Sequence, residues 1–229
     1  MITVVIPTLN EAKNIPNVIR AFKDLNYSYE IIFVDDNSDD NTEIVIQNLI
    51  NKKIKFIKRR KKKKDLSKSV MLGVQKASYN NILVIDCDLQ HNVKNANSMI
   101  KIFLREKLDI VIGSRFLKKK YSGNLGLLRS IFSLIFIFLI NFFFKKKSTD
   151  PLSGFFVCKK KIILNNKKNL YLRGYKILFD LLYNGKKNIT ILDFQINFKS
   201  RAYGKSKLNY KIVFIFIKQF LYSYLNKNK

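Results

Sequence analysis

The stretch NILVIDCDLQH, residues 81–91, places two carboxylates one residue apart directly after a short apolar run. The run at 81–85 is continuous rather than alternating, which predicts a β-strand that is covered on both faces. Asp is disfavoured in strands, and the charges of Asp86 and Asp88 repel each other at this spacing. A strand that ends in two such residues marks either a turn or a site that uses both carboxylates.

The same alternation of short apolar runs and amphipathic segments fills the first half of the 229-residue chain. Strands alternating with helices are typical of βαβ units, and continuous apolar strands belong to parallel sheets. The sequence therefore predicts an α/β fold with a mostly parallel, Rossmann-like sheet flanked by helices. Strands are expected at 2–6, 30–34, 54–57, 81–85 and 109–113, and helices at 11–24, 41–50, 67–77 and 93–106.

Polar side chains follow three of these strands. Ligands bind at the carboxyl ends of the strands in sheets of this type, so we expect these side chains to converge on one crevice. Two of the three clusters are acidic, in a chain whose net charge is +28, and this contrast favours a functional site. The residues are Thr8, Asn10 and Glu11 after the first strand, Asp35, Asp36 and Asn37 after the second, and Asp86, Asp88 and Gln90 after the fourth.

The cluster after the fourth strand offers two carboxylates and an amide oxygen, the ligands that Mg²⁺ or Mn²⁺ prefers. A bare Asp-x-Asp is more often a capped turn, but the converging clusters favour the metal site here. Asp35 and Asp36 also have two possible roles. They either cap the helix at 41–50 or accept hydrogen bonds from ribose hydroxyls or base N–H groups, and one of the pair can take each role.

The positive charge points to nucleic acid, an anionic membrane surface or phosphorylated substrates as partners. Solvated lysine faces offer a simpler source for part of the excess. Nucleic-acid binding is disfavoured, because the basic runs near 58, 118, 145 and 159 lack the interleaved aromatic side chains that stack on bases. The run KRRKKKK at 58–64 either is drawn to an anionic leaflet or forms a solvated loop.

The longest apolar run, IFSLIFIFLINFFF at 131–144, belongs to the less regular second half. As a helix it rises about 21 Å, against roughly 30 Å for the hydrocarbon core of a bilayer. Extension back to Leu127 includes Arg129, so an interfacial helix or a buried core helix is favoured over a membrane span. A second amphipathic helix is expected at 208–225, after a helix near 175–183 and a strand near 189–194.

Six motifs resemble the family 2 glycosyltransferases of GT-A type, in the dolichol- or polyprenol-phosphate mannose synthase branch. They occur in the order of that family and span almost the whole chain, and the string DCDLQH is far more specific than a bare Asp-x-Asp. The resemblance implies a single GT-A catalytic domain over 1–229, with a nucleotide-sugar half at about 1–115 and an acceptor and membrane-interface half at about 116–229. The motifs are VVIPTLNEAKNI, IIFVDDNSDDNT, VIDCDLQH, VIGSRF, DPLSGFFVCKK and KSRAYGKSKL.

The resemblance also implies roles for individual residues. Asp88, Arg115, Arg129 and Arg201 are expected to be catalytic. Pro7, Asn10, Glu11, Asp36 and Asp86 are expected to bind the nucleotide-sugar, and Asp86, Asp88 and Gln90 to hold Mg²⁺ or Mn²⁺. Arg115, Arg129, Ser133, Arg201 and Lys205 are expected to surround the acceptor phosphate.

The implied reaction moves a hexose, mannose favoured, to a polyprenyl phosphate with inversion at the sugar carbon. The expected donor is GDP-mannose, with UDP-glucose possible. The expected place is the cytoplasmic face of the cell membrane, with the protein peripheral or interfacially anchored, and a membrane-anchor partner protein is possible. Other sugars or acceptors and, outside enzymes, a basic nucleic-acid-binding module are the alternatives. The run at 58–64 departs from the family, whose members usually carry glycines and small residues there.

Overall fold

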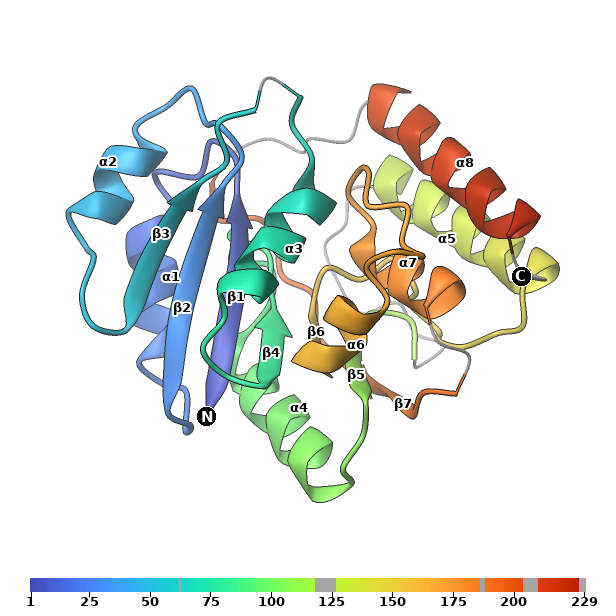
Figure 1. Cartoon of the computed structure of the whole chain (residues 1–229), viewed down its shortest axis with the longest axis horizontal. Coiled ribbons are helices and arrows are strands. Elements are labelled where there is room, and N and C mark those ends of the chain that lie inside the picture. Colours follow the sequence, from blue (N-terminus) through green and yellow to red (C-terminus); the bar gives the residue numbers. More distant parts are fainter. Residues whose placement is uncertain (62, 118–126, 186–187, 204–209, 227–229) are drawn as a thin grey trace.

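The computed structural model describes residues 1–61, 63–117, 127–185, 188–203 and 210–226 (Figure 1). Within these ranges the strands form one seven-stranded sheet in the order β3-β2-β1-β4-β6-β5-β7. The strands are β1 Ile2–Thr8, β2 Tyr29–Asp35, β3 Ile54–Lys58, β4 Asn81–Val84, β5 Ile110–Ser114, β6 Phe156–Lys159 and β7 Ile191–Gln195. The helices are α1 Ile15–Phe22, α2 Thr42–Gln47, α3 Leu66–Lys76, α4 Val93–Arg105, α5 Leu127–Phe143, α6 Lys160–Asn165, α7 Ile177–Asn184 and α8 Tyr210–Leu225.

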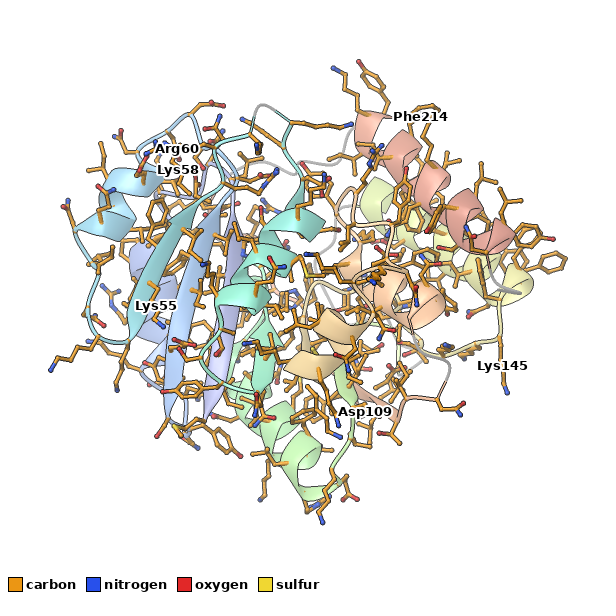
Figure 2. All side chains as sticks on the ribbon, in the orientation of Figure 1. Lys55, Lys58, Arg60, Asp109, Lys145 and Phe214 are labelled. Carbon is orange, nitrogen blue, oxygen red and sulfur yellow. The ribbon has the colours of Figure 1, made fainter. Side chains whose placement is uncertain are left out.

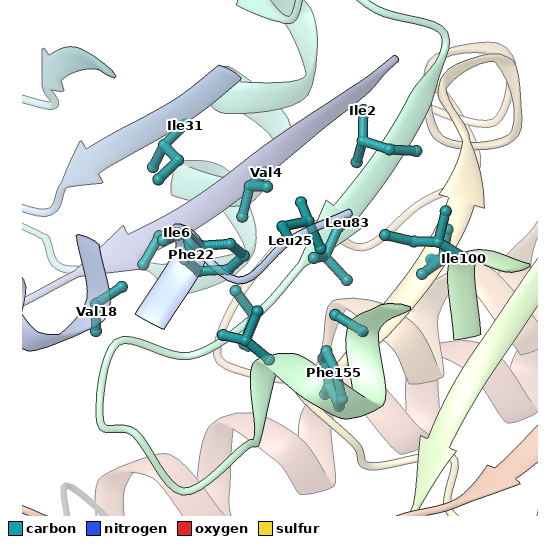
Figure 3. Close-up of a cluster of buried hydrophobic side chains, with 14 of the residues drawn as sticks. Ile2, Val4, Ile6, Val18, Phe22, Leu25, Ile31, Leu83, Ile100 and Phe155 are labelled. Atoms are coloured by element: carbon teal, nitrogen blue, oxygen red, sulfur yellow. The ribbon is translucent and has the colours of Figure 1, made fainter. Parts of the chain in front are cut away.

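The apolar strands are buried because helices cover both faces of the sheet. One hydrophobic cluster joins β1 and β2 to α1 and α4, and it includes Phe22, Phe33 and Phe155 (Figure 3). A second cluster joins the other face to α3, α6 and α7. Gly73 lets α3 lie close to the sheet, since a Cβ at this position would stand 2.5 Å from Val5 Cγ1. The predicted α/β class with a mostly parallel sheet is confirmed.

Strand β6 is the part of the sheet that the sequence pattern does not predict. It lies between β4 and β5 and is antiparallel to both, and α6 follows it without a break. Because β6 runs in the opposite direction, the residues that precede it, Asp150 to Gly154, lie at the same edge as the carboxyl ends of β4 and β5. This edge is where the polar clusters were expected to meet.

Helices α5 and α8 lie side by side, away from the β3 edge of the sheet (Figure 1). Their aromatic rings interlock: the centroids of Phe136 and Phe216 are 4.8 Å apart, and those of Phe144 and Phe220 are 5.3 Å apart. Among the described residues, no helix has both the length and the apolar character needed to span a bilayer. The outer faces of the pair expose Ile131, Phe132, Leu134, Ile135, Phe138, Phe142 and Phe143 from α5, and Tyr210, Phe214, Ile217, Leu221, Tyr224 and Leu225 from α8.

Candidate functional site

A cavity of about 170 Å³ opens at the carboxyl ends of the central strands. Its polar side brings together residues that are far apart in the chain, and its apolar side is built by α5 and α8. Eight of the predicted site residues line it: Pro7, Glu11, Asp36, Asp86, Asp88, Arg115, Ser133 and Arg201. The lining also includes Phe132 and Phe136 from α5, Ile212, Val213 and Phe216 from α8, and Leu66, Leu152, Gly154, Tyr175 and Lys176.

Asp86 and Asp88 differ in their surroundings although one residue separates them. The Asp86 side chain is 38% exposed, whereas the Asp88 side chain is 7% exposed and pairs with Arg201 at 2.8 Å. Burial and the charge of Asp86 raise the pKa of Asp88 above its ordinary value, against the opposing effects of His91 and Arg201. The site therefore holds concentrated negative charge at which a cation is stabilised.

Gly154 shapes the space beside Asp86. A Cβ at this position would stand 2.5 Å from Asp86 Oδ2, so only glycine leaves the carboxylate in its present place. No cluster of three or more His, Cys, Asp or Glu side chains that could hold a metal occurs in the described part of the chain. Two carboxylates that line a cavity fit a Mg²⁺ or Mn²⁺ ion, which usually takes one or two carboxylates and completes its coordination with water and substrate phosphates.

Gln90 does not stand with the two carboxylates in the cavity lining. Its side-chain nitrogen donates to the carbonyl of Lys199 at 3.0 Å, and its backbone N–H donates to Asp88 Oδ1 at 3.2 Å. The side-chain oxygen is buried and has no hydrogen-bond partner among the described residues. In this structure Gln90 orients Asp88, and its role as a metal ligand stays a prediction.

The two aspartates at the end of β2 take different roles. Asp35 is fully buried and holds the following turn, accepting hydrogen bonds from Ser38 N at 2.9 Å and from Thr8 Oγ1 at 3.3 Å. Asp36 lines the cavity instead. Its two carboxylate oxygens accept from Arg59 and from the backbone N–H of Asp65. Of the two, Asp36 is therefore the one that lines the cavity, and its role in nucleotide binding stays a prediction.

The basic run at 58–64 is tied to this same edge rather than left wholly to solvent. Three of its side chains form ion pairs with acids that follow β2, so neither a free solvated loop nor a lipid-facing run describes all of it. The pairs are Lys58 with Glu43, Arg59 with Asp36, and Lys64 with Asp39.

Of the two predicted site residues in the loop after β1, one lines the cavity and the other does not. Glu11 lines the cavity, its carboxylate accepts from Asn14 Nδ2 at 2.6 Å, and its N–H donates to Thr42 Oγ1 at 2.9 Å. Asn10 is exposed and absent from the lining. Its side-chain oxygen accepts from Asp39 N at 2.9 Å, so it joins the two loops, and its role in nucleotide binding stays a prediction.

Arg115 is held by Asp150, the first residue of the motif DPLSGFFVCKK, for which the sequence patterns predict no role of its own. Asp150 is fully buried and accepts from Arg115 Nε at 2.7 Å, from Nη2 at 2.8 Å and from the backbone N–H at 3.1 Å. A guanidinium fixed in this way has a defined direction toward the cavity. Ser133 lines the cavity from α5, whereas the side chain of Arg129 and the whole of Lys205 lie outside the described residues.

Sequence reasoning also misses Tyr175 and Lys176, which line the cavity from the loop before α7. Burial raises the pKa of Tyr175, and the nearby charges of Asp36 and Asp65 add to the rise. Lys176 Nζ donates to the carbonyl of Leu152 at 3.0 Å. Nothing in the local sequence pattern marks these two residues. Asp65 differs, because an Asp directly before a helix is a recognisable N-cap signal, and its side chain does accept from Lys68 N in the first turn of α3.

Comparison with known proteins agrees with this geometry. The model of the family described as Glycosyl transferase family 2 matches residues 3–165. A dolichol-phosphate mannosyltransferase of Pyrococcus furiosus is 34% identical over 223 residues, covering 95% of this chain and 62% of the relative. One of Mycosarcoma maydis is 29% identical over 238 residues, covering 97% of this chain and 78% of the relative. The chain thus spans less than two thirds of the first relative's length.

Solved structures share the fold. Glucosyl-3-phosphoglycerate synthase from Mycobacterium tuberculosis, solved with Mn²⁺, UDP and glucosyl-3-phosphoglycerate, gives a TM-score of 0.72 at 17% identity and covers 99% of this chain and 79% of that one. S. aureus TarS 1–349 gives a TM-score of 0.60 at 16% identity and covers 87% and 60%. These likenesses confirm the predicted GT-A-type fold. Because the family match extends over most of the chain and the sequence relatives align along nearly all of it, the chain belongs to glycosyltransferase family 2.

Proposed function

We propose that this chain transfers a hexose, mannose favoured, from a nucleoside-diphosphate sugar to a polyprenyl phosphate at the cytoplasmic face of a membrane. One observation carries the proposal: a single cavity joins the Asp86 and Asp88 carboxylates to apolar side chains of two helices whose outer faces are exposed. An apolar wall that continues into exposed apolar helix faces suits an acceptor that carries a hydrocarbon chain. The names of the two mannosyltransferase relatives support the same substrate class.

The donor is expected to bind with its diphosphate at the acidic pair and its nucleoside toward Asp36 and Glu11. Asp86 and Asp88 would hold a Mg²⁺ or Mn²⁺ ion, which supplies charge neutralisation for the departing nucleoside diphosphate. The absence of a side chain at Gly154 lets the Asp86 carboxylate keep this position, because a Cβ there would stand 2.5 Å from Asp86 Oδ2. Arg201 holds the Asp88 carboxylate through their 2.8 Å pair.

The acceptor phosphate is expected to meet the guanidinium groups of Arg115 and Arg201. A phosphate monoester has its second pKa near 6 and is therefore largely dianionic at pH 7, so no side chain has to remove a proton from it. The arginines orient and partly neutralise this anion. Direct attack of its oxygen on the anomeric carbon inverts the configuration there.

Association with the membrane would place the cavity at headgroup depth. The exposed apolar side chains of α5 and α8 enter the interface, and the exposed Lys145 and Lys146 at the end of α5 attract anionic lipid (Figure 2 shows Lys145). A peripheral or interfacially anchored protein follows from this arrangement. A partner membrane protein that assists anchoring is part of the proposal.

A donor screen tests the function. Radiolabelled GDP-mannose, GDP-glucose, UDP-glucose and UDP-N-acetylglucosamine are each incubated with the chain, Mn²⁺ and polyprenyl phosphate in detergent, and the label is partitioned between organic and aqueous phases. Label from GDP-mannose is expected in the organic phase, and Asp88→Asn should leave it in the aqueous phase. Organic-phase label from UDP-glucose alone supports a polyprenyl-phosphate glucosyltransferase instead. Transfer solely into water-soluble products overturns the lipid acceptor.

A further inference from the structure

The Asp36 carboxylate is held on both of its oxygens by groups from two different segments. Arg59 Nε donates to Oδ1 at 2.6 Å, and Arg59 Nη2 pairs with the same oxygen. The backbone N–H of Asp65, the residue that caps α3, donates to Oδ2. The side chains of Arg59 and Asp36 are only 9% and 5% exposed, so this pair is almost completely withdrawn from water. A carboxylate fixed in this way has a single orientation.

Arg59 is distinguished from its neighbours in the basic run. Its guanidinium also donates to the carbonyl of Lys63 at 2.8 Å, and its backbone N–H donates to the carbonyl of Asp35 at 2.8 Å. Arg60, the next residue, has an exposed side chain (Figure 2). The two arginines therefore carry the same charge on the same loop, and only Arg59 is built into the site.

Arg59 does not line the cavity, whereas Asp36 does. Any effect of Arg59 on a bound nucleotide must therefore pass through Asp36. Each Asp36 oxygen has two lone pairs and accepts one hydrogen bond, Oδ1 from Arg59 Nε and Oδ2 from the N–H of Asp65, because Arg59 Nη2 donates its hydrogen bond to the carbonyl of Lys63. One acceptor position is therefore left on each oxygen. The group is then a pair of adjacent acceptors with a fixed direction.

Nucleobases differ in how they meet such a pair. Guanine presents two adjacent N–H donors, N1–H and N2–H, one for each oxygen. Uracil presents one N–H between two carbonyl oxygens. Adenine and cytosine present one amino group beside a ring nitrogen that is itself an acceptor and would repel the second oxygen. A carboxylate that rotates freely distinguishes these edges less well than one that is fixed.

We propose that Arg59 is a specificity-determining positioning residue for the donor nucleobase: with the N–H of Asp65 it fixes Asp36 as a two-oxygen acceptor that selects guanine. This inference rests on the proposed function, because it takes the cavity as the nucleotide site. It goes further in assigning base selection to a residue of the basic run. The order of affinity for nucleoside diphosphates is GDP, then UDP, then ADP and CDP.

Isothermal titration of the full chain with GDP, UDP, ADP and CDP in the presence of Mn²⁺ tests it. The wild type is expected to bind GDP about tenfold more tightly than ADP, the discrimination typical of one good bidentate contact. Arg59→Gln should weaken GDP binding by a similar factor and leave ADP binding nearly unchanged. The ratio of the affinity for GDP to the affinity for ADP, called the GDP-to-ADP ratio below, then falls toward one. Arg60→Gln removes the same charge from the same loop and should keep the ratio. Arg59→Lys should restore part of it.

The outcomes separate this inference from the function on which it rests. Equal GDP-to-ADP ratios in the wild type and Arg59→Gln overturn it, as does a uniform loss for all four nucleotides, which would assign Asp36 to the ribose. If Arg59→Gln does not fold, Asp36→Asn serves instead, since an amide in place of the carboxylate should also abolish the ratio. A wild type that binds none of the four nucleotides refutes the nucleotide site itself, and with it the proposed transfer.

Discussion

Replacement of Phe138 and Phe142 by Ser tests whether the outer face of α5 enters a membrane. These side chains are 68% and 73% exposed, and their rings stack with centroids 6.4 Å apart. Full burial of a phenylalanine contributes roughly 1.5 to 3 kcal/mol, so burial of these exposed fractions contributes about 1.5 kcal/mol for each ring. The double variant should therefore lose about 3 kcal/mol of binding free energy, or about 100-fold in the partition coefficient.

Sedimentation with vesicles that contain one third anionic lipid measures this coefficient directly. The matched control is Ile44→Ser with Leu104→Ser, which removes two exposed apolar side chains from α2 and α4 instead. The control should bind vesicles as the wild type does, and thermal melting should show that both double variants stay folded. If the phenylalanine variant sediments with vesicles as strongly as the wild type, the outer face of α5 does not enter the membrane, and the binding comes from α8 or from lysine charge.

Three further predictions concern the acidic site and the stability of the sheet. Asp88→Asn should lower sugar transfer more than about 100-fold, because it removes one of the two carboxylates proposed to hold the metal; near-normal turnover with Mn²⁺ present would contradict the assignment. Gly154→Ala places a methyl carbon 2.5 Å from Asp86 Oδ2 and should weaken Mn²⁺ binding about tenfold by calorimetry, whereas unchanged affinity would show that Asp86 is not a ligand. Glu30→Gln should lower the free energy of unfolding by about 2 kcal/mol at pH 7. Burial alone would raise the pKa of Glu30. The hydrogen bonds from Lys55, Thr3 and Ser78 together outweigh it, so the pKa of Glu30 lies below its ordinary value. Its stabilisation is therefore full above pH 4.5 and is lost as the pH falls through the lowered pKa, so denaturant curves of the two proteins should converge in acid. A gap that persists undiminished would mean that packing, not the carboxylate charge, is responsible.

The parallel strands could be predicted because each one is a short apolar run with its own turn and helix signals. Strand β6 could not, since Phe156–Lys159 passes directly into α6 with no turn between them to mark where the strand ends. Its position between β4 and β5 depends on pairing with residues 74 and 46 positions earlier, since Val157 pairs with Leu83 and with Val111. Local pattern carries no information about such pairing.

Part of the candidate site could be predicted from the sequence in the same way. Convergence of the clusters after β1, β2 and β4 follows from parallel topology, and the cavity lining agrees with it. Residue chemistry alone could not choose between Asp35 and Asp36, because the two side chains are identical and adjacent residues of an extended strand point to opposite sides. The expectation for Asp36 came from the family resemblance. Arg59 was hidden for another reason: its partner Asp36 is 23 residues away, and a lysine-rich run is usually solvated.

The inserted antiparallel strand has a consequence for how the chain acquires its structure during synthesis. Strands β1 to β4 can pair as soon as they leave the ribosome, but β5 emerges before the strand that must join it to β4. About forty residues separate the end of β5 from the start of β6, which at ordinary rates of translation is a delay of roughly 2 to 8 s. During that time the free edge of β4 and the apolar residues of β5 remain open to wrong partners. Rare codons between residues 115 and 155 would lengthen this exposure, so chaperone demand should rise with slower translation of that segment.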